Sequence, residues 1–178
     1  MQYYLVASLP SIALGDDPPW TPEEFLFHSQ GALTEEERAE LAVIVEDRPQ
    51  EGVSEFAAWW AALDTQIRNT IARLRASRLN VDVRPYLRLH SGFDVCVDHA
   101  VTDAMNHDQP LEREMALDRC RWEALDRRVL GDAFGLETVL AFVLRLRMMN
   151  RWAPLTDKAG QERIENFITE NTDQSLEP

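Results

Sequence analysis

The chain has 178 residues, of which 45% are hydrophobic and 28% charged, and its formal net charge at pH 7 is −13. This length and balance are typical of one soluble globular domain, residues 1–178, and exclude a chain that is disordered throughout. Only seven glycines and few β-branched runs favour helix over sheet. The acidic total disfavours general nucleic-acid binding, because the long-range field repels phosphate.

The charge is unevenly distributed along the chain. Residues 1–60 carry 12 acidic residues against two arginines, whereas residues 61–152 carry 13 acidic residues against 14 arginines. The sequence therefore predicts an acidic protein with a roughly neutral, arginine-dense middle. Cys96 and Cys120 are isolated cysteines, so we expect neither a disulfide framework nor a zinc site, and no cofactor is predicted.

The N-terminal stretch MQYYLVASLP lacks the positive charge of a signal peptide and is broken by Pro10. No apolar run approaches the ~20 residues that span a bilayer. We therefore expect a cytoplasmic protein that is not inserted in the membrane, with peripheral association at the inner membrane left open.

The first 20 residues form an N-terminal segment and a loop. YYLVASL (3–9) predicts either a short extended strand or a buried helical turn, since periodicity does not distinguish the two over seven residues. DDPPW then predicts a loop. Thr21 begins a helix, because its hydroxyl precedes a proline at the first helical position and two glutamates.

Two further helices begin at hydroxyl caps. Thr34, with Glu37 placed to complete a capping box, predicts a helix to about Asp47. Ser54 begins the longest helix, which we expect to end near Leu79 because Pro85 restricts the backbone of the residue before it. Its apolar stripe is Phe56, Trp60, Leu63, Ile67, Ile71 and Leu74, and Asp64 with Arg68 forms an i, i+4 pair beside it.

The second half of the chain predicts a helix from about Asp94 to Asn106 and another that ends near Gly131. The apolar stripe of the latter is Leu111, Met115, Trp122, Leu125 and Val129, interrupted by Asp118. Residues 136–152 are apolar nearly all round, which indicates a central buried helix. Residues 160–171 predict a modest amphipathic helix, and residues 172–178 a frayed tail. The expected fold is an all-α, compact bundle of six to seven helices.

Two groups of residues could support metal binding or acid/base catalysis. His99, Asp103 and His107 are four residues apart in turn, and a continuous helix would place them on one face as weak candidate metal ligands. Asp118 and Glu137 lie within apolar stretches, where two carboxylates could act as an acid/base pair. The favoured alternative is that these carboxylates form structural ion pairs with arginines between helices, since buried charges are costly unless paired.

The candidate arginine partners lie in FVLRLRMMNRW (142–152) and at Arg121. We expect Asp118 or Glu137 to pair with at least one of Arg145, Arg147 and Arg151. Replacing Arg147 with methionine is then predicted to leave a buried acid unpaired.

A basic run occupies the middle of the chain and is opposed only by Asp82. Its members are Arg68, Arg73, Arg75, Arg78, Arg84 and Arg88. The run favours either self-neutralisation by the acidic N-terminal third or docking of an acidic protein surface. Trp59 lies outside the apolar stripe of its helix and is a further candidate for partner binding, because aromatic side chains are common interface anchors.

Three stretches resemble a bacterial family of uncharacterised helical proteins encoded beside V-type (A/V-type) rotary ATPase subunits. They are YYLVASLP, IRNTIARLRASRLNVD (67–82) and RWEALDRRVLGDAFGLETVLAFVLRLRMMNRW (121–152), and the strings W-x-x-L-D and L-R-L-x-x-x-x-R-W are the most particular. That family resembles a reduced form of the ATPase C subunit, called d in the eukaryotic enzyme. The full C subunit is a longer, three-part helical funnel, which 178 residues do not reproduce.

The resemblance implies an all-α fold and a non-enzymatic accessory or structural protein that links or assembles the central stalk and the membrane ring. It carries over no catalytic residue. Two alternatives stay open, namely a small metal-binding or acid/base helical enzyme and a regulatory helical adaptor unrelated to the ATPase.

Overall fold

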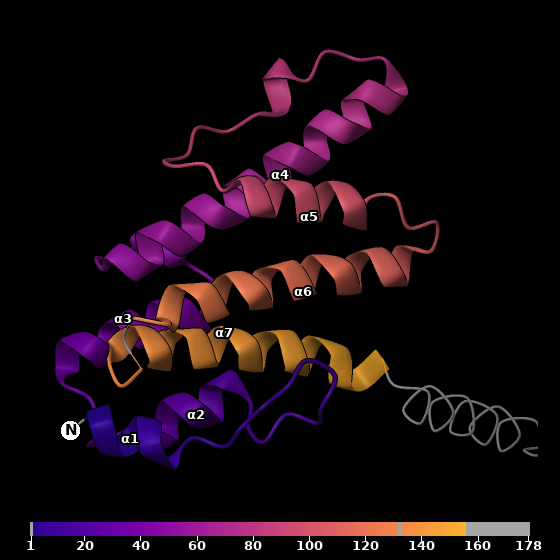
Figure 1. The fold of residues 1–178 in the computed structure, drawn as a ribbon. Helices are drawn as coiled ribbons and strands as arrows, with labels where there is room; N and C mark the ends of the chain where they lie inside the picture. Colours follow the sequence, from indigo (N-terminus) through magenta and orange to yellow (C-terminus); the bar gives the residue numbers. More distant parts are fainter. Residues whose placement is uncertain (1, 132, 156–178) are drawn as a thin grey trace, which may run out of the picture.

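The computed structural model describes residues 2–131 and 133–155, and within them the fold is all-α, as predicted from the sequence. The described residues form seven α-helices and no strand (Figure 1). The helices are α1 (Gln2–Ser8), α2 (Pro22–His28), α3 (Glu35–Val45), α4 (Glu55–Leu79), α5 (Val95–Ala104), α6 (Pro110–Val129) and α7 (Leu136–Trp152). The expected helix at 160–171 and the expected frayed tail lie outside the described residues.

The N-terminal segment is a helix, so the extended alternative for residues 3–9 is wrong. A helix satisfies its own backbone groups, whereas a strand needs a neighbour, and none exists among the described residues. The helical alternative is confirmed, and its burial is partial: Leu5 and Val6 pack against the core, whereas Tyr3 and Tyr4 are exposed. Tyr3 contacts Phe134, which precedes α7, at 4.7 Å between ring centroids.

The capping signals of α2 and α3 act as predicted. The Thr21 hydroxyl accepts from the Glu24 amide while the Glu24 carboxylate accepts from the Thr21 amide, and Thr34 and Glu37 form the same reciprocal pair. Helix α3 ends at Val45, two residues before the expected limit.

The start of α4 is fixed by a carboxylate from α3 that the sequence did not single out. Glu40 is buried, and its oxygens accept hydrogen bonds from the Val53 amide at 3.0 Å, from the Ser54 amide at 3.0 Å and from the Ser54 hydroxyl. The Ser54 hydroxyl in turn accepts from the Ala57 amide. Gly52 allows this approach, since a Cβ there would lie 2.7 Å from a Glu40 oxygen. The carboxylate therefore ties α3 to the first turn of α4.

Helix α4 ends at Leu79 as expected, but the reason given from the sequence is wrong. Asn80 adopts the left-handed conformation (φ 54°, ψ 45°), and the Val81 amide donates to the Ala76 carbonyl at 3.0 Å. These features form a helix-ending motif that does not involve proline. Pro85 lies further on, inside a short 3-10 helix (Arg84–Tyr86).

Helices α5 and α6 form a hairpin, and the predicted stripe of α6 is only partly correct. Asp94 caps α5 through hydrogen bonds from the Cys96 and Val97 amides, as its position predicted. In α6, however, Leu111 and Met115 are exposed. The buried face of α6 begins at Leu117 and consists of Leu117, Asp118, Cys120, Ala124 and Leu125.

Helix α7 is the centre of the core, as its apolar sequence predicted. Nine of its 17 residues are buried, and it contacts α1, α2 and α3 on one side and α6 on the other. The order of neighbours continues from α6 to α5 and from α5 to α4 (Figure 1). No helix in the described parts of the chain combines the length and apolar character that crossing a membrane requires.

Candidate functional site

The last third of α4 and the loop that follows it extend away from the helix bundle (Figure 1). Among the residues of α4 beyond Thr70, Ala76 is the one that is buried. We define the protrusion as residues 71–93 and the body as the other described residues. The protrusion contains no buried residue of the central core cluster, although Ile71 and Leu74 at its start pack against that cluster.

Two carboxamide side chains of α4 hold the base of the protrusion. Asn69 is buried, donates to the Arg88 carbonyl at 2.7 Å and accepts from the Arg88 amide at 3.0 Å. Gln66 is also buried and makes the same two contacts with the carbonyl and amide of Asp94, at 2.7 and 2.9 Å. We call these contacts the amide clamps. The sequence analysis missed them, although polar amides beside the apolar stripe of a long helix were a visible signal.

The arginines of the predicted basic run are all exposed, and most of them belong to the protrusion. Three have contacts: Arg68 pairs with Asp64 at 2.7 Å, Arg84 with Asp82 at 3.0 Å, and Arg78 donates to the Met105 carbonyl at 2.8 Å. The first predicted outcome, self-neutralisation by the N-terminal third, is limited among the described residues: no ion pair joins the run to that third, and Arg68 contributes only a lesser charge effect to the lowered pKa of Asp47. Within residues 2–131 and 133–155, no ion pair involves Arg73, Arg75 or Arg88.

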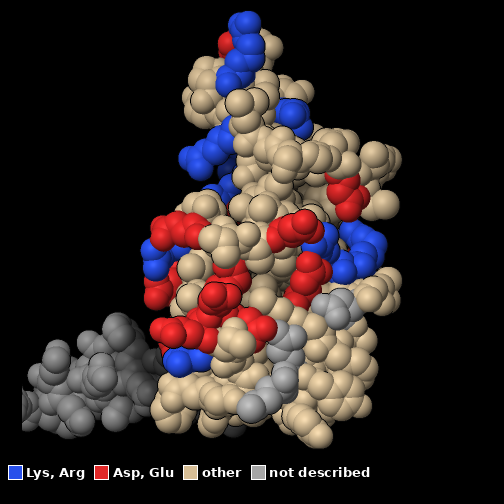
Figure 2. All heavy atoms as spheres, turned by 90° about the vertical axis from the view of Figure 1, so that its left-hand side faces the viewer, with Lys and Arg blue, Asp and Glu red and all other residues tan. Residues whose placement is uncertain are grey.

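Figure 2 shows basic side chains at the top of the molecule, over the end of α4 and its loop, and acidic side chains gathered over the body below. The protrusion also exposes large apolar side chains. They are Leu79 (72% exposed), Val81 (52%), Tyr86 (67%), Leu89 (103%) and Phe93 (57%). Apolar residues grouped among arginines are typical of a protein interaction surface.

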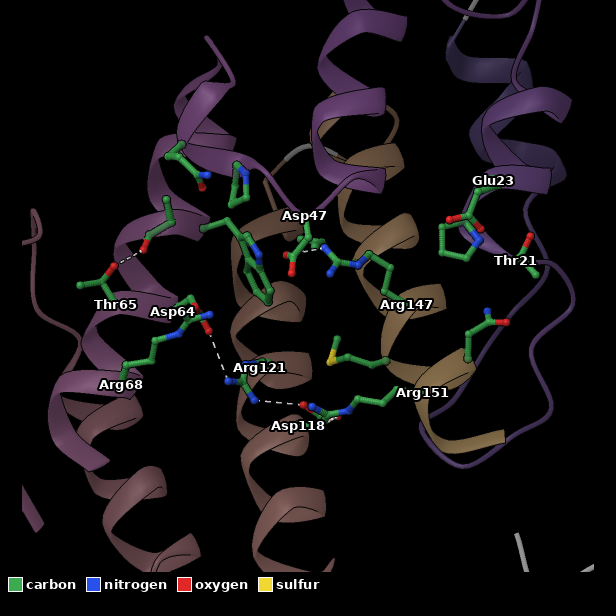
Figure 3. Close-up of a pocket in the computed structure, with 18 of the residues that line it drawn as sticks. Thr21, Glu23, Asp47, Asp64, Thr65, Arg68, Asp118, Arg121, Arg147 and Arg151 are labelled. Carbon is green, nitrogen blue, oxygen red and sulfur yellow. Dashed lines mark hydrogen bonds and ion pairs between the residues drawn. The ribbon is translucent and has the colours of Figure 1, made fainter. Parts of the chain in front are cut away.

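The body contains a second polar feature, a pocket of about 1040 Å³ between α4, α6, α7 and the start of α2 (Figure 3). Arginines and carboxylates alternate along its wall. Arg121 lies between Asp64 at 3.3 Å and Asp118 at 3.0 Å, and Arg147 contacts Asp47 at 2.7 Å. The hydrogen bond from Arg147 is the main cause that lowers the pKa of Asp47.

Asp118 is the most deeply buried charge of this pocket, with 1% of its surface exposed. Its carboxylate contacts the guanidinium groups of Arg121 and Arg151 and accepts from the Trp152 indole at 2.8 Å. The network joins α6 to the end of α7. Because the buried carboxylate is held by three donors of this chain, the arrangement is that of an ion pair inside the fold.

The other charged residues of α7 also form ion pairs, as predicted, although with partners that the sequence did not specify. Arg145 contacts Asp126 at 2.6 Å, Arg147 contacts the exposed Asp47, and Glu137 pairs with Arg128 at 2.5 Å. The expectation that Asp118 or Glu137 pairs with at least one of Arg145, Arg147 and Arg151 is confirmed by the contact of Arg151 with Asp118, whereas Arg145 and Arg147 pair with other carboxylates. Burial lowers the pKa of Arg145, and Asp126 opposes that shift.

Asp118 and Glu137 are not brought together as an acid/base pair. Arg128, the partner of Glu137, lies ten residues after Asp118 on α6, a distance of about 15 Å along a helix.

The weak metal candidates are also separated. Helix α5 ends at Ala104, so His107 does not continue the face of His99 and Asp103. It lies instead 3.7 Å from Glu112. No group of three or more His, Cys, Asp or Glu residues suited to a metal ion occurs in the described part of the chain. Burial raises the pKa of the Cys120 thiol to about 11.

Trp59 lies in the first third of α4, away from the protrusion. It is half-buried, packs against the core, contacts Phe56 and Trp60, and has the Arg128 guanidinium 5.5 Å from its ring centroid. Much of its ring is therefore already in contact with this chain.

Comparison with known proteins gives one result. A family model described as "Protein of unknown function (DUF2764)" matches residues 97–174. The matched range begins in α5 and includes α6 and α7, and it leaves out the protrusion. Searches of curated proteins and of solved structures found no significant match. The later part of the chain is thus similar to a family whose description assigns no activity.

Proposed function

We propose that this chain is a non-catalytic docking protein associated with a V-type rotary ATPase, a C-subunit-like component that links or assembles the central stalk and the membrane ring. The protrusion is the surface through which it binds a protein partner. The observation that carries the proposal is that the protrusion combines exposed apolar side chains with arginines that have no ion-pair partner among the described residues.

The sequence resemblance supports the link to the ATPase. Of the three stretches that resemble the ATPase-associated family, IRNTIARLRASRLNVD (67–82) covers the end of α4 and the start of the protruding loop. Its second half lies in the protrusion and includes the exposed Arg73, Arg75 and Leu79, so the resemblance and the exposed surface overlap.

The polar pocket favours a structural role over acid/base chemistry. Its buried carboxylate, Asp118, already contacts two guanidinium groups and one indole N–H. A general acid or base must exchange a proton with a bound substrate, and a carboxylate surrounded by three donors from its own chain is poorly placed for that exchange.

The proposal is tested by co-purification. The chain is tagged in the cells that encode it, membranes are solubilised with a mild detergent, and captured proteins are identified by mass spectrometry at low and moderate salt. We expect ATPase stalk or ring subunits, with more recovered at low salt because arginine–carboxylate attraction is screened by salt.

The matched variants are Arg75→Glu in the protrusion and Arg119→Glu on α6, since both arginines are exposed and both changes alter the net charge equally. Capture should fall for the first and stay for the second. Recovery of no ATPase subunit at either salt would overturn the proposal, and recovery of a different regulatory complex would favour an adaptor unrelated to the ATPase.

A further inference from the structure

We infer that the protrusion recognises an acidic, amphipathic segment of its protein partner, which places carboxylates against the arginines and apolar side chains against the exposed apolar residues between them. This inference rests on the proposed docking function and names the chemistry of the partner.

The charge of the protrusion favours an anionic partner. Asp82 is the one acidic residue between 71 and 93, and it is already held by Arg84, whose hydrogen bond lowers the pKa of Asp82. Arg73, Arg75 and Arg88 are exposed, and no ion pair among the described residues involves them. A guanidinium fork matches a carboxylate in two parallel hydrogen bonds, so carboxylate side chains are suitable ligands.

The exposed apolar residues of the protrusion favour a partner that supplies apolar side chains as well as negative charge. Leu89 is fully exposed, and Tyr86 and Leu79 are each more than two-thirds exposed. Arg75 and Leu79 lie four residues apart on α4 and therefore share one helix face. A segment that presents carboxylates and apolar side chains together would cover both kinds of group, whereas a purely acidic segment would leave the apolar residues in water.

The amide clamps make the surface suitable for binding before a partner arrives. Asn69 and Gln66 hold the backbone at Arg88 and Asp94 with two hydrogen bonds each. Leu89 directly follows the clamped Arg88, and Phe93 directly precedes the clamped Asp94. Binding then costs less loop-ordering entropy than it would for a loop without these contacts.

A discrete segment fits this surface better than a lipid bilayer or a nucleic acid. Both of these are extended anionic surfaces, and contact with them would bring the acidic body of a chain with net charge −13 close to the same surface (Figure 2). Repulsion acts over a Debye length of about 8 Å at physiological salt. A short helix or strand of a partner can contact the protrusion alone.

The test uses the full chain and a synthetic 18-residue peptide with glutamates on one helical face and leucines on the other. Fluorescence anisotropy measures binding of the labelled peptide. We expect saturable binding that weakens roughly tenfold for Arg75→Glu and for Leu89→Ser. Matched controls are Arg119→Glu and Leu130→Ser, in which exposed residues outside the protrusion are changed, and a peptide with glutamine in place of glutamate should bind far more weakly.

Four outcomes overturn the inference, provided that circular dichroism finds all variants folded. The first is that the control variants weaken peptide binding as much as the protrusion variants do, and the second is that the glutamine peptide binds as tightly as the glutamate peptide. The third is that the chain binds phosphatidylserine vesicles or single-stranded RNA but not the acidic peptide. The fourth is that the chain associates with itself in a concentration-dependent way that the Arg75→Glu change abolishes. The docking proposal can fail independently of this inference. If the peptide binds but no ATPase subunit is captured, only the assignment to the ATPase is contradicted. If ATPase subunits are still captured by the Arg75→Glu variant, only the inference about the protrusion is contradicted.

Discussion

The body and the protrusion use the same residue type in opposite ways. In the body, Arg121, Arg147 and Arg151 each contact a carboxylate from another part of the chain. In the protrusion, Arg73 and Arg75 have no ion-pair partner among the described residues, although the chain as a whole carries a large excess of acid. The excess acid therefore lies where it does not neutralise the protrusion.

Burial of at least one partner explains the difference: Arg121 and Arg147 are partly buried, and the half-exposed Arg151 pairs with the buried Asp118. A guanidinium group that loses water must gain a carboxylate, because an unpaired buried charge costs several kcal/mol. An exposed guanidinium loses no water and needs no partner for the fold. Arginines of the body are thus predicted to affect stability, and arginines of the protrusion to affect binding.

The largest expected effect comes from breaking the network of the body at Asp118. Asp118→Asn removes the negative charge that Arg121 and Arg151 share. We expect a loss of about 3 kcal/mol in the free energy of unfolding, measured by urea denaturation.

The matched control is Asp47→Asn, which removes the charge from an exposed carboxylate paired with Arg147. Its cost should be at most about 1 kcal/mol. The same pair corrects the sequence-based expectation that Arg147→Met leaves a buried acid unpaired, since Asp47 is 66% exposed in its side chain. Equal losses for the two asparagine variants would contradict the distinction between buried and exposed pairs.

The next largest effect is expected at Glu40, whose carboxylate binds the backbone at the start of α4. Burial alone would raise the pKa of Glu40, but hydrogen bonds from Ser54 and from the Val53 and Ser54 amides bring it below its ordinary value. A lowered folded-state pKa stabilises the protein above the unfolded value of about 4.3 and loses this effect as the pH falls through the folded-state value. Glu40→Gln should cost about 2 kcal/mol at pH 7.

Urea denaturation between pH 7 and pH 3 measures this dependence. The difference between the native chain and Glu40→Gln should be constant down to about pH 5 and shrink below it. A difference that grows on acidification would mean that the carboxylate is protonated in the folded protein, and the assigned hydrogen-bond pattern would be wrong.

The sequence predicted the helices well, because the signals for them are local. Thr21, Thr34, Ser54 and Asp94 each cap the helix that their position indicated. The apolar run at 136–152 likewise forms the central helix with the expected bounds. Capping and periodicity depend on residues within one or two helical turns, so they can be recognised without knowledge of the fold.

Partners across the fold were predicted less well, for a physical reason. The partner of Arg147 is 100 residues away and that of Arg145 is 19 residues away, and a charge pattern gives no preference among many exposed acids. Leu111 and Met115 followed the expected spacing yet are exposed, because spacing defines a helix face but not how far its neighbour extends. The exposure of the protrusion likewise depends on how far the neighbouring helices extend, which the sequence pattern does not indicate.

Loosening the protrusion without changing its charge gives a smaller effect on stability. Asn69→Ala removes both side-chain contacts with the backbone of Arg88, and we expect a global loss of about 1 kcal/mol because water replaces part of the lost bonding. Hydrogen exchange at the Arg88 amide should accelerate, and binding of the acidic peptide should weaken although every arginine is present.

Thr65→Ala is the control for the clamp, since the Thr65 hydroxyl donates to the Ala61 carbonyl within α4. It should leave exchange at Arg88 unchanged. Unaltered exchange at Arg88 in Asn69→Ala would show that the loop is held by something other than the amide clamps.

The smallest expected effect on stability is the most informative for function. Arg75→Met removes an exposed guanidinium with no ion-pair partner among the described residues, and it should change the free energy of unfolding by no more than about 0.5 kcal/mol. Arg121→Met, which deprives both Asp64 and Asp118 of a partner, should cost clearly more in the same urea titration. A residue whose loss leaves stability unchanged but weakens capture of a partner acts outside the fold. If Arg75→Met and Arg121→Met cost the same, the protrusion is held by charge within this chain, and its arginines are not available to a partner.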